Sequence, residues 1–414
     1  MLEQIEGSLG VAKAVALCRP GVVCAYPISP QTHIVENVGK FVKNGTLKDC
    51  DFLNVESEFS AISVAIGSEV GGARTYTATA SQGLLYMTEG VYSASGLGLP
   101  IVMTVASRAI GGPINIWNDH SDSLSQRDSG WLQLFCESNQ DAVDTHIMAF
   151  KIAEEVGLPV MVCMDGFVLT HAFERLDIPS QETVDKFLPE YQPREFLTPK
   201  EPVSIGAMVG PEAFTEVRFL QQRKMAKALK VIEKVTKEYR DLTGSKSGGL
   251  LDCYNCENAD LKLVIMGSTV GTAKDEIDRL EAEGINVGII SLKSFRPFPY
   301  EAMAKAIGDT KKVICLERAF SFGARGIVCP EVKRAMEGKN CDVKTVVAGL
   351  GGRPIFGTTI RGIVKDALAD KFTEEFTWFD VNADVLNSYT DKTEGVTFKN
   401  GPIAQSVLEN SVKD

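Results

Sequence analysis

The sequence has no apolar run that approaches the ~18 residues of a membrane-spanning helix. It also begins without the basic stretch and apolar core of a secretory signal, so we expect a cytoplasmic protein. Basic residues are outnumbered, since 43 Lys and Arg stand against 54 Asp and Glu and give a formal net charge of -11. Such a chain repels nucleic-acid phosphates, and no nucleic-acid partner is predicted. A hydrophobic content of 44% excludes a disordered chain.

Residues that bind metal ions are few and scattered. There are four histidines, and of the ten cysteines only Cys253 and Cys256 form a C-x-x-C pair. One such pair supplies half of a zinc or iron–sulfur site, and the sequence has no second pair. The Gly- and Asn-containing residues around it predict a loop. The polar run 117–122 (WNDHSD) is interpreted as a loop that caps a helix, so no metal ligand is predicted on this chain.

Several cofactor motifs are absent as well. The sequence contains no G-x-x-x-x-G-K-[S/T] phosphate loop, no G-x-S-x-G nucleophile elbow and no G-x-G-x-x-G after its first predicted strand. It also has no G-D-G followed by paired asparagines, the pattern with which thiamine enzymes hold magnesium and diphosphate. The Gly-rich run 267–273 (GSTVGTA) is only a weak signal for phosphate binding.

The sequence does contain short apolar runs that alternate with helical stretches. Runs rich in β-branched residues predict buried parallel strands at 21–25, 75–80, 100–106, 159–164, 261–266, 285–291, 311–316 and 343–348. Helical patterns include 57–71 and 141–156, the second with Asp141 at the predicted cap. Strands and helices that alternate in this way predict an α/β protein with two doubly wound parallel-sheet domains.

Changes in composition mark the expected domain organisation. The predicted segments are a first domain at 1–242, a linker at 243–258, a second domain at 259–373 and a tail at 374–414. The first domain ends in a Pro-rich surface connection at 189–210 and a helix of about thirty residues. The acidic and polar tail is either a partner-binding arm or a loose end.

One candidate binding loop follows the first predicted strand. Residues 26–30 (YPISP) place Pro27, Ile28 and Ser29 at the carboxyl end of that strand, where ligands bind in open parallel sheets. Two prolines restrain the loop and present the Ser29 hydroxyl together with nearby backbone N–H groups. A rigid strand-to-helix turn without a ligand explains the same residues equally well.

Two further candidates follow later strands. Ser81 and Gln82 precede Gly83, which allows close backbone approach, while the Gln82 amide offers both a donor and an acceptor. Arg108 stands at the end of the run PIVMTVASRAI, where its guanidinium can hold a carboxylate through two hydrogen bonds. A plain turn and a structural ion pair are the respective alternatives.

Glu58 begins a predicted helix whose other members are mostly small and apolar. Such surroundings disfavour the charged carboxylate, raise its pKa and let it share a proton with a ligand. The alternative is a carboxylate that is satisfied by the positive end of the helix dipole. Because Ser57 and Glu58 are adjacent, they do not form a capping box.

Taken together and in order, these motifs resemble the α subunits of multi-subunit 2-oxoacid:ferredoxin oxidoreductases, most of all the pyruvate type (pyruvate synthase). The resemblance extends from Glu6 to about Asn387. Its motifs are AYPISPQTHIVE, VESEFSAISVAIG, TATASQGLLYMTE, PINIWNDHSDSLSQRDSGW, ESNQDAVDT, MDGFVLTH, FRPFP and FSFGARG.

The resemblance implies thiamine diphosphate shared with a β subunit, which holds the diphosphate and Mg²⁺. The first domain is then of the pyrimidine-binding type and the second is similar to the transketolase C-terminal domain. The family further implies γ and δ (ferredoxin-like) subunits with iron–sulfur clusters, ferredoxin as electron acceptor, and CoA as the acceptor of the acyl group. The missing diphosphate, cluster and CoA motifs agree with such a division of labour.

Site roles carry over by position. Glu58 matches the glutamate that hydrogen-bonds N1′ of the aminopyrimidine, and Arg108 matches the arginine that contacts the substrate carboxylate and carbonyl oxygen. Pro27, Ile28, Ser29, Ser81 and Gln82 complete the implied cofactor and substrate contacts. Ser29 stands where the pyruvate enzymes usually carry threonine, so the pocket is expected to be one methyl group larger.

This departure keeps other functions open. One alternative is an oxidoreductase for a bulkier 2-oxoacid, such as 2-oxobutyrate, a branched-chain acid or an aryl acid like phenylglyoxylate. Another is a transketolase-like enzyme without a redox step. The third is a non-catalytic scaffold subunit.

Overall fold

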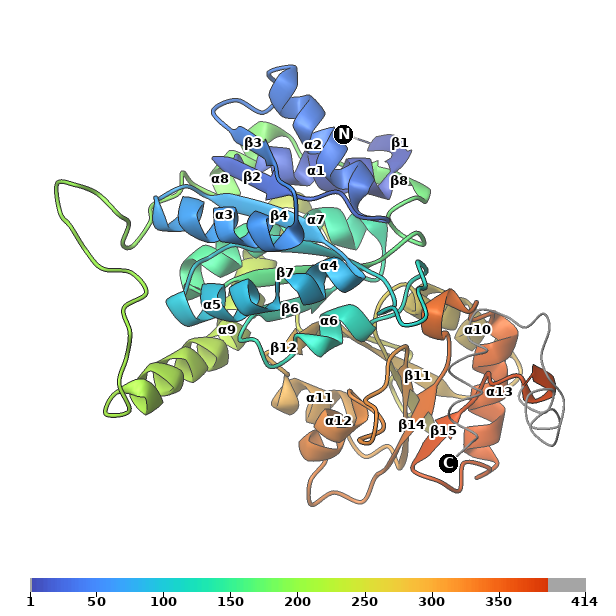
Figure 1. The fold of residues 1–414 in the computed structure, drawn as a ribbon. Helices are drawn as coiled ribbons and strands as arrows, with labels where there is room; N and C mark the ends of the chain where they lie inside the picture. The colour runs from blue at the N-terminus through green and yellow to red at the C-terminus, as the bar shows by residue number, and fades with distance from the viewer. Residues whose placement is uncertain (1, 386–414) are drawn as a thin grey trace, which may run out of the picture.

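A computed structural model describes residues 2–385 of the chain. Two α/β halves lie side by side, with the amino-terminal half at the top of Figure 1 and the carboxyl-terminal half at its lower right. Each half is built on its own sheet, and the strands of both sheets are mainly parallel. The predicted fold class is therefore confirmed.

The sheet of the first half has seven strands. Their order is β12 (Ser294–Arg296), β6 (Leu132–Phe135), β7 (Val160–Asp165), β5 (Val102–Ser107), β4 (Thr75–Thr79), β2 (Val22–Ala25) and β3 (Asp51–Asn54). Only β12 runs antiparallel to its neighbour. The central strands β4, β5 and β7 are buried along their whole length, as expected of strands with helices on both faces.

Helices cover both faces of this sheet. One face carries α1 (Gly7–Leu17), α2 (Thr32–Lys43) and α7 (Asn139–Val156), with α8 (Gln181–Phe187) and α9 (Phe214–Thr243) packed outside them. The other face carries α3 (Glu58–Val70), α4 (Ser81–Tyr86), α5 (Thr88–Leu97) and α6 (Ser121–Ser125). The predicted long helix is α9, and the irregular connection that leads to it extends away from the body in Figure 1.

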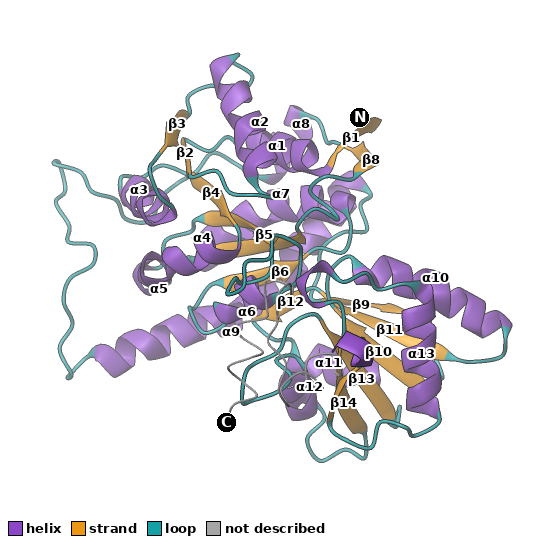
Figure 2. Ribbon diagram, turned by 45° about the vertical axis from the view of Figure 1, so that its right-hand side comes forward, coloured by secondary structure: helices purple, strands orange, loops and turns teal. Residues whose placement is uncertain are grey.

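The second sheet has six strands. Their order is β15 (Phe376–Trp378), β14 (Asp342–Val347), β13 (Lys312–Glu317), β10 (Leu261–Ile265), β11 (Val287–Leu292) and β9 (Leu251–Tyr254), of which only β9 is antiparallel. Helices α10 (Thr269–Ala282) and α13 (Gly357–Leu368) lie on one side, and α11 (Tyr300–Ile307) and α12 (Cys329–Ala335) on the other (Figure 2). A short 3-10 helix, η1 (Leu350–Gly352), follows β14.

A small third sheet pairs the amino terminus with a distant segment. Strand β1 (Leu2–Glu6) is antiparallel to β8 (Phe173–Asp177), and Glu6 faces Phe173. The pairing continues past β1, because the Gly7 N–H donates to Ala172 O and the Ser8 N–H to Thr170 O. The first residues of the chain are thereby fixed against the loop that precedes β8.

The two halves share a hydrophobic core. Leu124, Trp131 and Phe135 of the first half pack in one cluster with Phe295 and Val313 of the second. Strand β12, which belongs to the FRPFP run, leaves the second half and extends the first sheet. Large aromatic side chains are buried on both sides of the boundary. Their packing, rather than the linker between the halves, therefore fixes the relative position of the two halves.

Several predicted elements differ in detail. Asp141 does not cap α7, because the helix begins earlier and the Ser138 side chain accepts a hydrogen bond from the Asp141 N–H. The prediction of a loop around the C-x-x-C pair is wrong for Cys253, which lies in β9 and pairs with Ile290 of β11.

The domain boundaries stay a prediction. Of the predicted tail, 376–378 form β15, and 386–414 lie outside the described residues.

Candidate functional site

The candidate residues meet at one edge of the first sheet. They follow four strands that are neighbours in the order β5, β4, β2 and β3, and all four run in parallel. Arg108 follows β5, Ser81 and Gln82 follow β4, Ser29 follows β2, and Glu58 follows β3. Since the carboxyl ends of parallel strands lie at the same edge, residues far apart in sequence converge there.

Arg108 lies at the centre of this edge. Its Nη1 donates to the backbone O of Ser29 at 2.8 Å, its Nη2 to Gln82 Oε1 at 3.3 Å and its Nε to the backbone O of Asn115 at 3.2 Å. The residue is 5% exposed, and burial lowers the pKa of its guanidinium although nearby Asp122 opposes that shift. A guanidinium has five N–H donors, so two remain for a ligand.

Ser81 and Gln82 connect Arg108 to the neighbouring strand. Ser81 has a φ of 49° and is fully buried, with its hydroxyl bonded to Gln82 Oε1 and to the backbone O of Ala109. Left-handed φ is costly for a residue with a Cβ, and such residues gather at functional sites. The Gln82 amide lies directly against Gly111, where a Cβ would overlap Nε2.

Glu58 is the first residue of α3 and is 8% exposed. Ser57 caps the helix by accepting a hydrogen bond from the Ser60 N–H, so the Glu58 carboxylate is not needed for that purpose. Within residues 2–385 no group donates a hydrogen bond to this carboxylate. The side chain is thus mostly buried while its carboxylate keeps its hydrogen-bonding capacity for a group from outside the described chain.

The surroundings of Glu58 form a narrow cradle. A Cβ on Gly83 would stand 2.6 Å from Glu58 Oε1 and 2.6 Å from Thr79 Oγ1, so only glycine leaves room there. The Thr79 hydroxyl is itself buried and has no hydrogen-bond partner. The Glu58 carboxylate and the Thr79 hydroxyl therefore both pack against the backbone at Gly83, and neither has a hydrogen-bond partner within the described residues.

The loop with Pro27, Ile28 and Ser29 is held in place by hydrogen bonds of the Gln31 side chain. Buried Gln31 accepts a hydrogen bond from the Ile28 N–H at 3.2 Å and donates to the backbone O of Ala78 at 2.7 Å. Pro27 and Ser29 are exposed and Ile28 is half-buried. The loop thus holds its shape while it leaves the Ser29 side chain accessible at the sheet edge.

Asp122 is a site residue that the sequence did not reveal. Its Oδ2 accepts from the backbone N–H groups of both Ser81 and Arg108 at 2.9 Å, and its Oδ1 accepts from the Ser123 N–H. Burial raises the pKa of this carboxyl to about 6, while the three backbone donors oppose the shift. Asp122 therefore joins the ends of β4 and β5. The run 117–122 was interpreted only as a helix-capping loop, and nothing in its pattern pointed to the two distant strands.

The second half contacts the loop that contains Asn115 and Asp119. Asn115 Nδ2 donates to the backbone O of Gly351 at 3.1 Å, and the Gly351 N–H donates to Asp119 Oδ2 at 3.0 Å. The Gly-rich run that hinted at phosphate binding faces a side chain of the protein itself, because the Ser268 N–H donates to Asp165 Oδ2 at 2.9 Å. Burial opposes the charge of Asp165, but facing Arg318 and His120 hold its carboxyl pKa well below the usual range. That turn is a contact between the halves.

Residues of the types that bind metal ions occur in two places, the Cys253–Cys256 pair and a surface cluster of one glutamate and two histidines. Cys253 is exposed and Cys256 half-buried, and a hydrogen bond from Cys256 lowers the pKa of the Cys253 thiol to about 7. Glu6, His33 and His171 converge on the surface, with all three ligand atoms within 4.8 Å of one another. Sequence reasoning missed this cluster because its members come from three distant segments.

Among the described helices, none is long and apolar enough to cross a membrane.

Two protein families match the chain. Residues 13–237 match the family described as pyruvate flavodoxin/ferredoxin oxidoreductase, thiamine diphosphate-binding. Residues 259–360 match the pyruvate:ferredoxin oxidoreductase core domain II. The two matches cover both sheets.

Curated relatives are similar over most of the chain. Pyruvate synthase subunit PorA of Methanosarcina barkeri is 44% identical over 87% of this chain and 91% of its own length. The subunit of the same name from Methanocaldococcus jannaschii is 46% identical, with coverages of 87% and 93%. Ketoisovalerate oxidoreductase subunit VorA of Pyrococcus horikoshii is 38% identical, with coverages of 91% and 97%.

Solved structures show the same fold. The 2-oxoglutarate:ferredoxin oxidoreductase of Magnetococcus marinus aligns with a TM-score of 0.68 and 22% identity over 89% of this chain and 65% of its own. A split-gene transketolase aligns with a TM-score of 0.52 and 14% identity over 89% of this chain and 99% of its own. The length and identity of the curated matches decide the family: the chain belongs to the pyruvate:ferredoxin oxidoreductase family, as the α subunit of a multi-subunit, ferredoxin-dependent 2-oxoacid oxidoreductase with a thiamine diphosphate-binding domain.

Proposed function

We propose that this chain carries the aminopyrimidine half of the thiamine diphosphate site in a pyruvate:ferredoxin oxidoreductase. A β subunit holds the diphosphate and Mg²⁺, and other subunits carry the iron–sulfur clusters that pass electrons to ferredoxin. One observation supports pyruvate as substrate: relatives at 44% and 46% identity are named pyruvate synthase subunits. The observation that carries the proposal is the mostly buried Glu58 side chain at the sheet edge, whose carboxylate has no hydrogen-bond partner within residues 2–385.

Glu58 fits one side of the pyrimidine ring. Its carboxylate holds a proton at ring atom N1′, and the Thr79 hydroxyl lies in the same cradle beside Gly83. Pro27, Ile28, Ser81 and Gln82 form the adjoining walls. Thiamine diphosphate, when bound, supplies the electron sink for the loss of CO2 from the 2-oxoacid. The chain's own contribution is to hold the ring, keep water from it and fix the proton.

Arg108 is proposed to bind the substrate. Its two remaining N–H donors suit the carboxylate of a 2-oxoacid, since a charge-assisted pair of hydrogen bonds is stronger than neutral ones. The bonds from Arg108 to Ser29 O and Gln82 Oε1 fix the guanidinium before substrate arrives. The Ser29 hydroxyl is the donor beside it, and CoA then accepts the acyl group at a site formed with other subunits.

Substitution of Glu58 tests the proposal. In the complex co-expressed with its β, γ and δ subunits, Glu58→Gln is expected to lower kcat for CoA-dependent viologen reduction with pyruvate by ~10²–10⁴-fold, the usual size of a lost acid–base contribution. The matched control is Glu56→Gln. Glu56 is exposed, lies two residues away and bonds Ser60, so its substitution is expected to leave kcat within about twofold.

Each alternative function has its own outcome. Normal turnover by Glu58→Gln would favour the scaffold subunit. A purified complex without visible iron–sulfur absorption would favour the non-redox, transketolase-like enzyme. The third comparison measures kcat/KM for pyruvate, 2-oxobutyrate, 2-oxoisovalerate and phenylglyoxylate. If a bulkier acid has the highest kcat/KM, that acid replaces pyruvate as the proposed substrate.

A further inference from the structure

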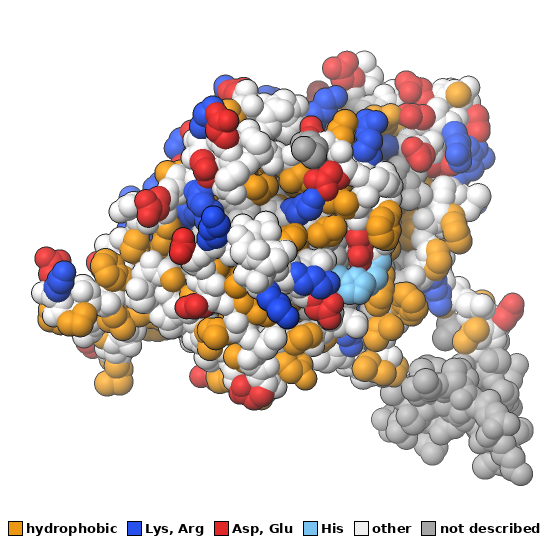
Figure 3. Space-filling view, turned by 90° about the horizontal axis from the view of Figure 1, so that it is seen from above, with side chains coloured by type: hydrophobic (Ala, Val, Ile, Leu, Met, Phe, Trp, Pro, Cys, Tyr) orange, Lys and Arg blue, Asp and Glu red, His pale blue; other side chains and the backbone are white. Residues whose placement is uncertain are grey.

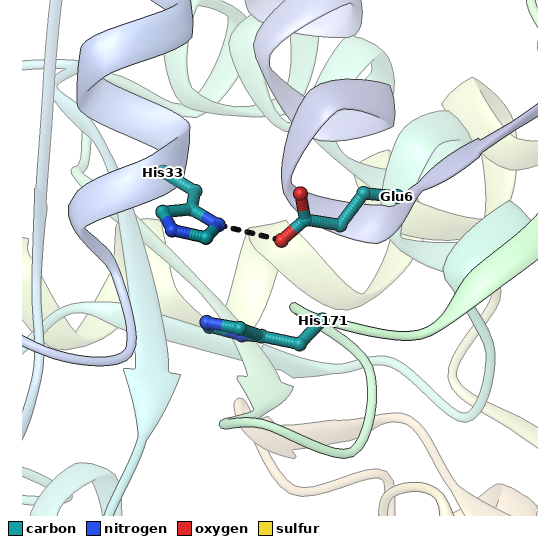
Figure 4. Close-up of side chains that lie close together, drawn as sticks. All are labelled: Glu6, His33 and His171. Atoms are coloured by element: carbon teal, nitrogen blue, oxygen red, sulfur yellow. Dashed lines mark hydrogen bonds and ion pairs between the residues drawn. The ribbon is translucent and has the colours of Figure 1, made fainter.

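Two histidines and one glutamate form a cluster on the surface of the first half. Glu6 ends β1, His33 is the second residue of α2, and His171 lies in the loop before β8. Their ligand atoms all lie within 4.8 Å of one another (Figure 4). We propose that Glu6, His33 and His171 bind one divalent transition-metal ion, with zinc as the best fit. The proposal does not depend on the proposed function.

The backbone brings the three residues together in a fixed way. Glu6 and His171 are held by the pairing of β1 with β8 and by the hydrogen bonds from Gly7 and Ser8 to the residues on either side of His171. His33 is held by α2, whose start is fixed to β4 through buried Gln31. Rigid elements on three sides make a better metal site than loops alone.

Each donor is in a suitable state for a metal ion. His33 Nδ1 lies 2.7 Å from Glu6 Oε1, where a cation can replace the shared proton. His171 Nδ1 lies 2.7 Å from Thr170 Oγ1. When Nδ1–H donates to that hydroxyl, the Nε2 lone pair is left for the metal, and histidine ligands are usually oriented by such a second hydrogen bond.

Thr170 is itself well fixed. Its hydroxyl accepts a hydrogen bond from the Phe167 N–H at 2.8 Å, and its backbone O accepts one from the Ser8 hydroxyl at 2.7 Å. The His171 ring also packs against Phe167, which packs against Trp117, with ring centroids 4.9 and 5.0 Å apart. These contacts orient His171 without using its Nε2 atom.

Charge and exposure also fit a metal ion. With both imidazoles in the neutral form that a metal ion requires, the cluster carries the single negative charge of Glu6, and within residues 2–385 no Lys or Arg forms an ion pair with Glu6. The side chain of His33 is 46% exposed and that of Glu6 is 18% exposed, so solvent reaches the cluster. Since His120 and His146 are buried, the histidine surface in Figure 3 belongs to this cluster. The open side leaves the fourth position of a tetrahedral ion for water.

The ligand set selects the metal. Imidazole and carboxylate together suit Zn²⁺ and Co²⁺ better than Mg²⁺ or Ca²⁺, which prefer oxygen ligands alone. Bonds of ~2.0–2.1 Å place tetrahedral ligand atoms about 3.3 Å apart. On binding, the atoms that lie up to 4.8 Å apart have to approach, whereas His33 Nδ1 and Glu6 Oε1, now 2.7 Å apart, have to separate slightly. The bound ion would link β1, α2 and the loop before β8, and α2 directly follows the loop with Ser29.

Cobalt binding to the full-length chain tests the proposal. The measurement is a Co²⁺ titration followed by the visible absorption of a four-coordinate site, in a Cys253→Ser background because Cys253 is a competing thiol. We expect one equivalent to bind, and His33→Ala and His171→Ala each to weaken binding at least ~10-fold. The matched control is Glu36→Gln, an exposed residue one turn along α2, which is expected to bind as the parent does.

A second measurement covers variants that are destabilised. Zn²⁺ is expected to raise the Tm of the parent and of Glu36→Gln, but not that of either histidine variant, because an ion that binds only the folded state stabilises it. The proposal is overturned if the parent binds Co²⁺ with a Kd weaker than about 1 mM. It is equally overturned if the histidine variants keep the parent's Co²⁺ affinity and Zn²⁺-dependent Tm.

Discussion

The two sheets each present a buried glutamate at their carboxyl edge, and the two glutamates differ in one respect. Glu58 packs against Gly83, and Glu317, the last residue of β13, packs against Gly326 so closely that a Cβ there would overlap it. Glu317 accepts hydrogen bonds from the backbone N–H groups of Ile327 and Val328 at 2.7 and 2.8 Å, and from Cys329 at 3.1 Å. Glu58 accepts none within the described chain.

The two sheet edges therefore differ in whether the protein itself supplies hydrogen bonds to the buried glutamate. Burial raises the pKa of the Glu317 carboxyl, while three backbone donors oppose the shift. The protein therefore satisfies Glu317 internally, whereas it leaves Glu58, the Thr79 hydroxyl and two Arg108 donors for something else. Two sheets of the same architecture thus differ in how far the polar groups at their carboxyl edges are satisfied within the described chain, and this difference agrees with the proposal that the first edge binds a ligand.

After Glu58→Gln, substitution of Arg108 is expected to have the largest effect at the carboxyl edge of the first sheet. Arg108→Ala should lower kcat/KM for pyruvate by roughly 10–150-fold, mainly through KM, since a lost charge-assisted contact costs about 1.5–3 kcal/mol. Steady-state kinetics of the assembled complex measure it. Arg108→Lys keeps the charge but not the fork of donors, and should recover only part of the loss. Unchanged kinetics in the alanine variant would remove Arg108 from the substrate site.

Substitution of Glu317 tests the other edge. Glu317→Gln removes one acceptor oxygen from the three backbone N–H groups, two of them on buried residues, and should lower the free energy of unfolding by about 1–3 kcal/mol. Urea unfolding of the full chain measures the loss, and kcat of the folded complex should stay within about twofold of the parent. A large fall in kcat with normal stability would show that the second edge also takes part in catalysis.

The smallest expected effect concerns substrate choice. Ser29→Thr adds one methyl group at the exposed end of the loop after β2 and should disfavour larger 2-oxoacids. The ratio of kcat/KM for pyruvate to that for 2-oxoisovalerate is expected to rise about fourfold, which corresponds to ~0.8 kcal/mol for one carbon. A ratio that stays constant or falls would place the Ser29 side chain outside the substrate pocket.

Elements with strong patterns were predictable from the sequence. The buried strands β4, β5, β7, β10 and β13 and the helices α3, α7 and α9 lie within a few residues of their predicted places. Short elements were missed. Strand β6 has four residues, β12 has three, and β9 lies in a segment with loop composition. Such strands depend on a partner strand rather than on their own periodicity.

The candidate site divides in the same way. That Glu58, Arg108, Ser29 and Gln82 lie at one edge of the sheet was predictable, because each follows a predicted strand or begins a predicted helix, while their roles stay a prediction. Asp122 was not, because its importance comes from N–H groups at the ends of two other strands. The cluster of Glu6, His33 and His171 was equally hidden, since 165 residues separate its ends in the chain.

By itself the sequence determined the strongly patterned strands and helices, the sheet edge at which the candidate residues gather, and the family. These follow from local periodicity and from residue order, which need no partner. Only the tertiary structure decided which buried carboxylate is satisfied and which is free, how β12 and the shared core join the two halves, and where two histidines meet a glutamate. Hydrogen bonds and metal ligation depend on distances between groups remote in the chain, and such distances exist only once the core has packed.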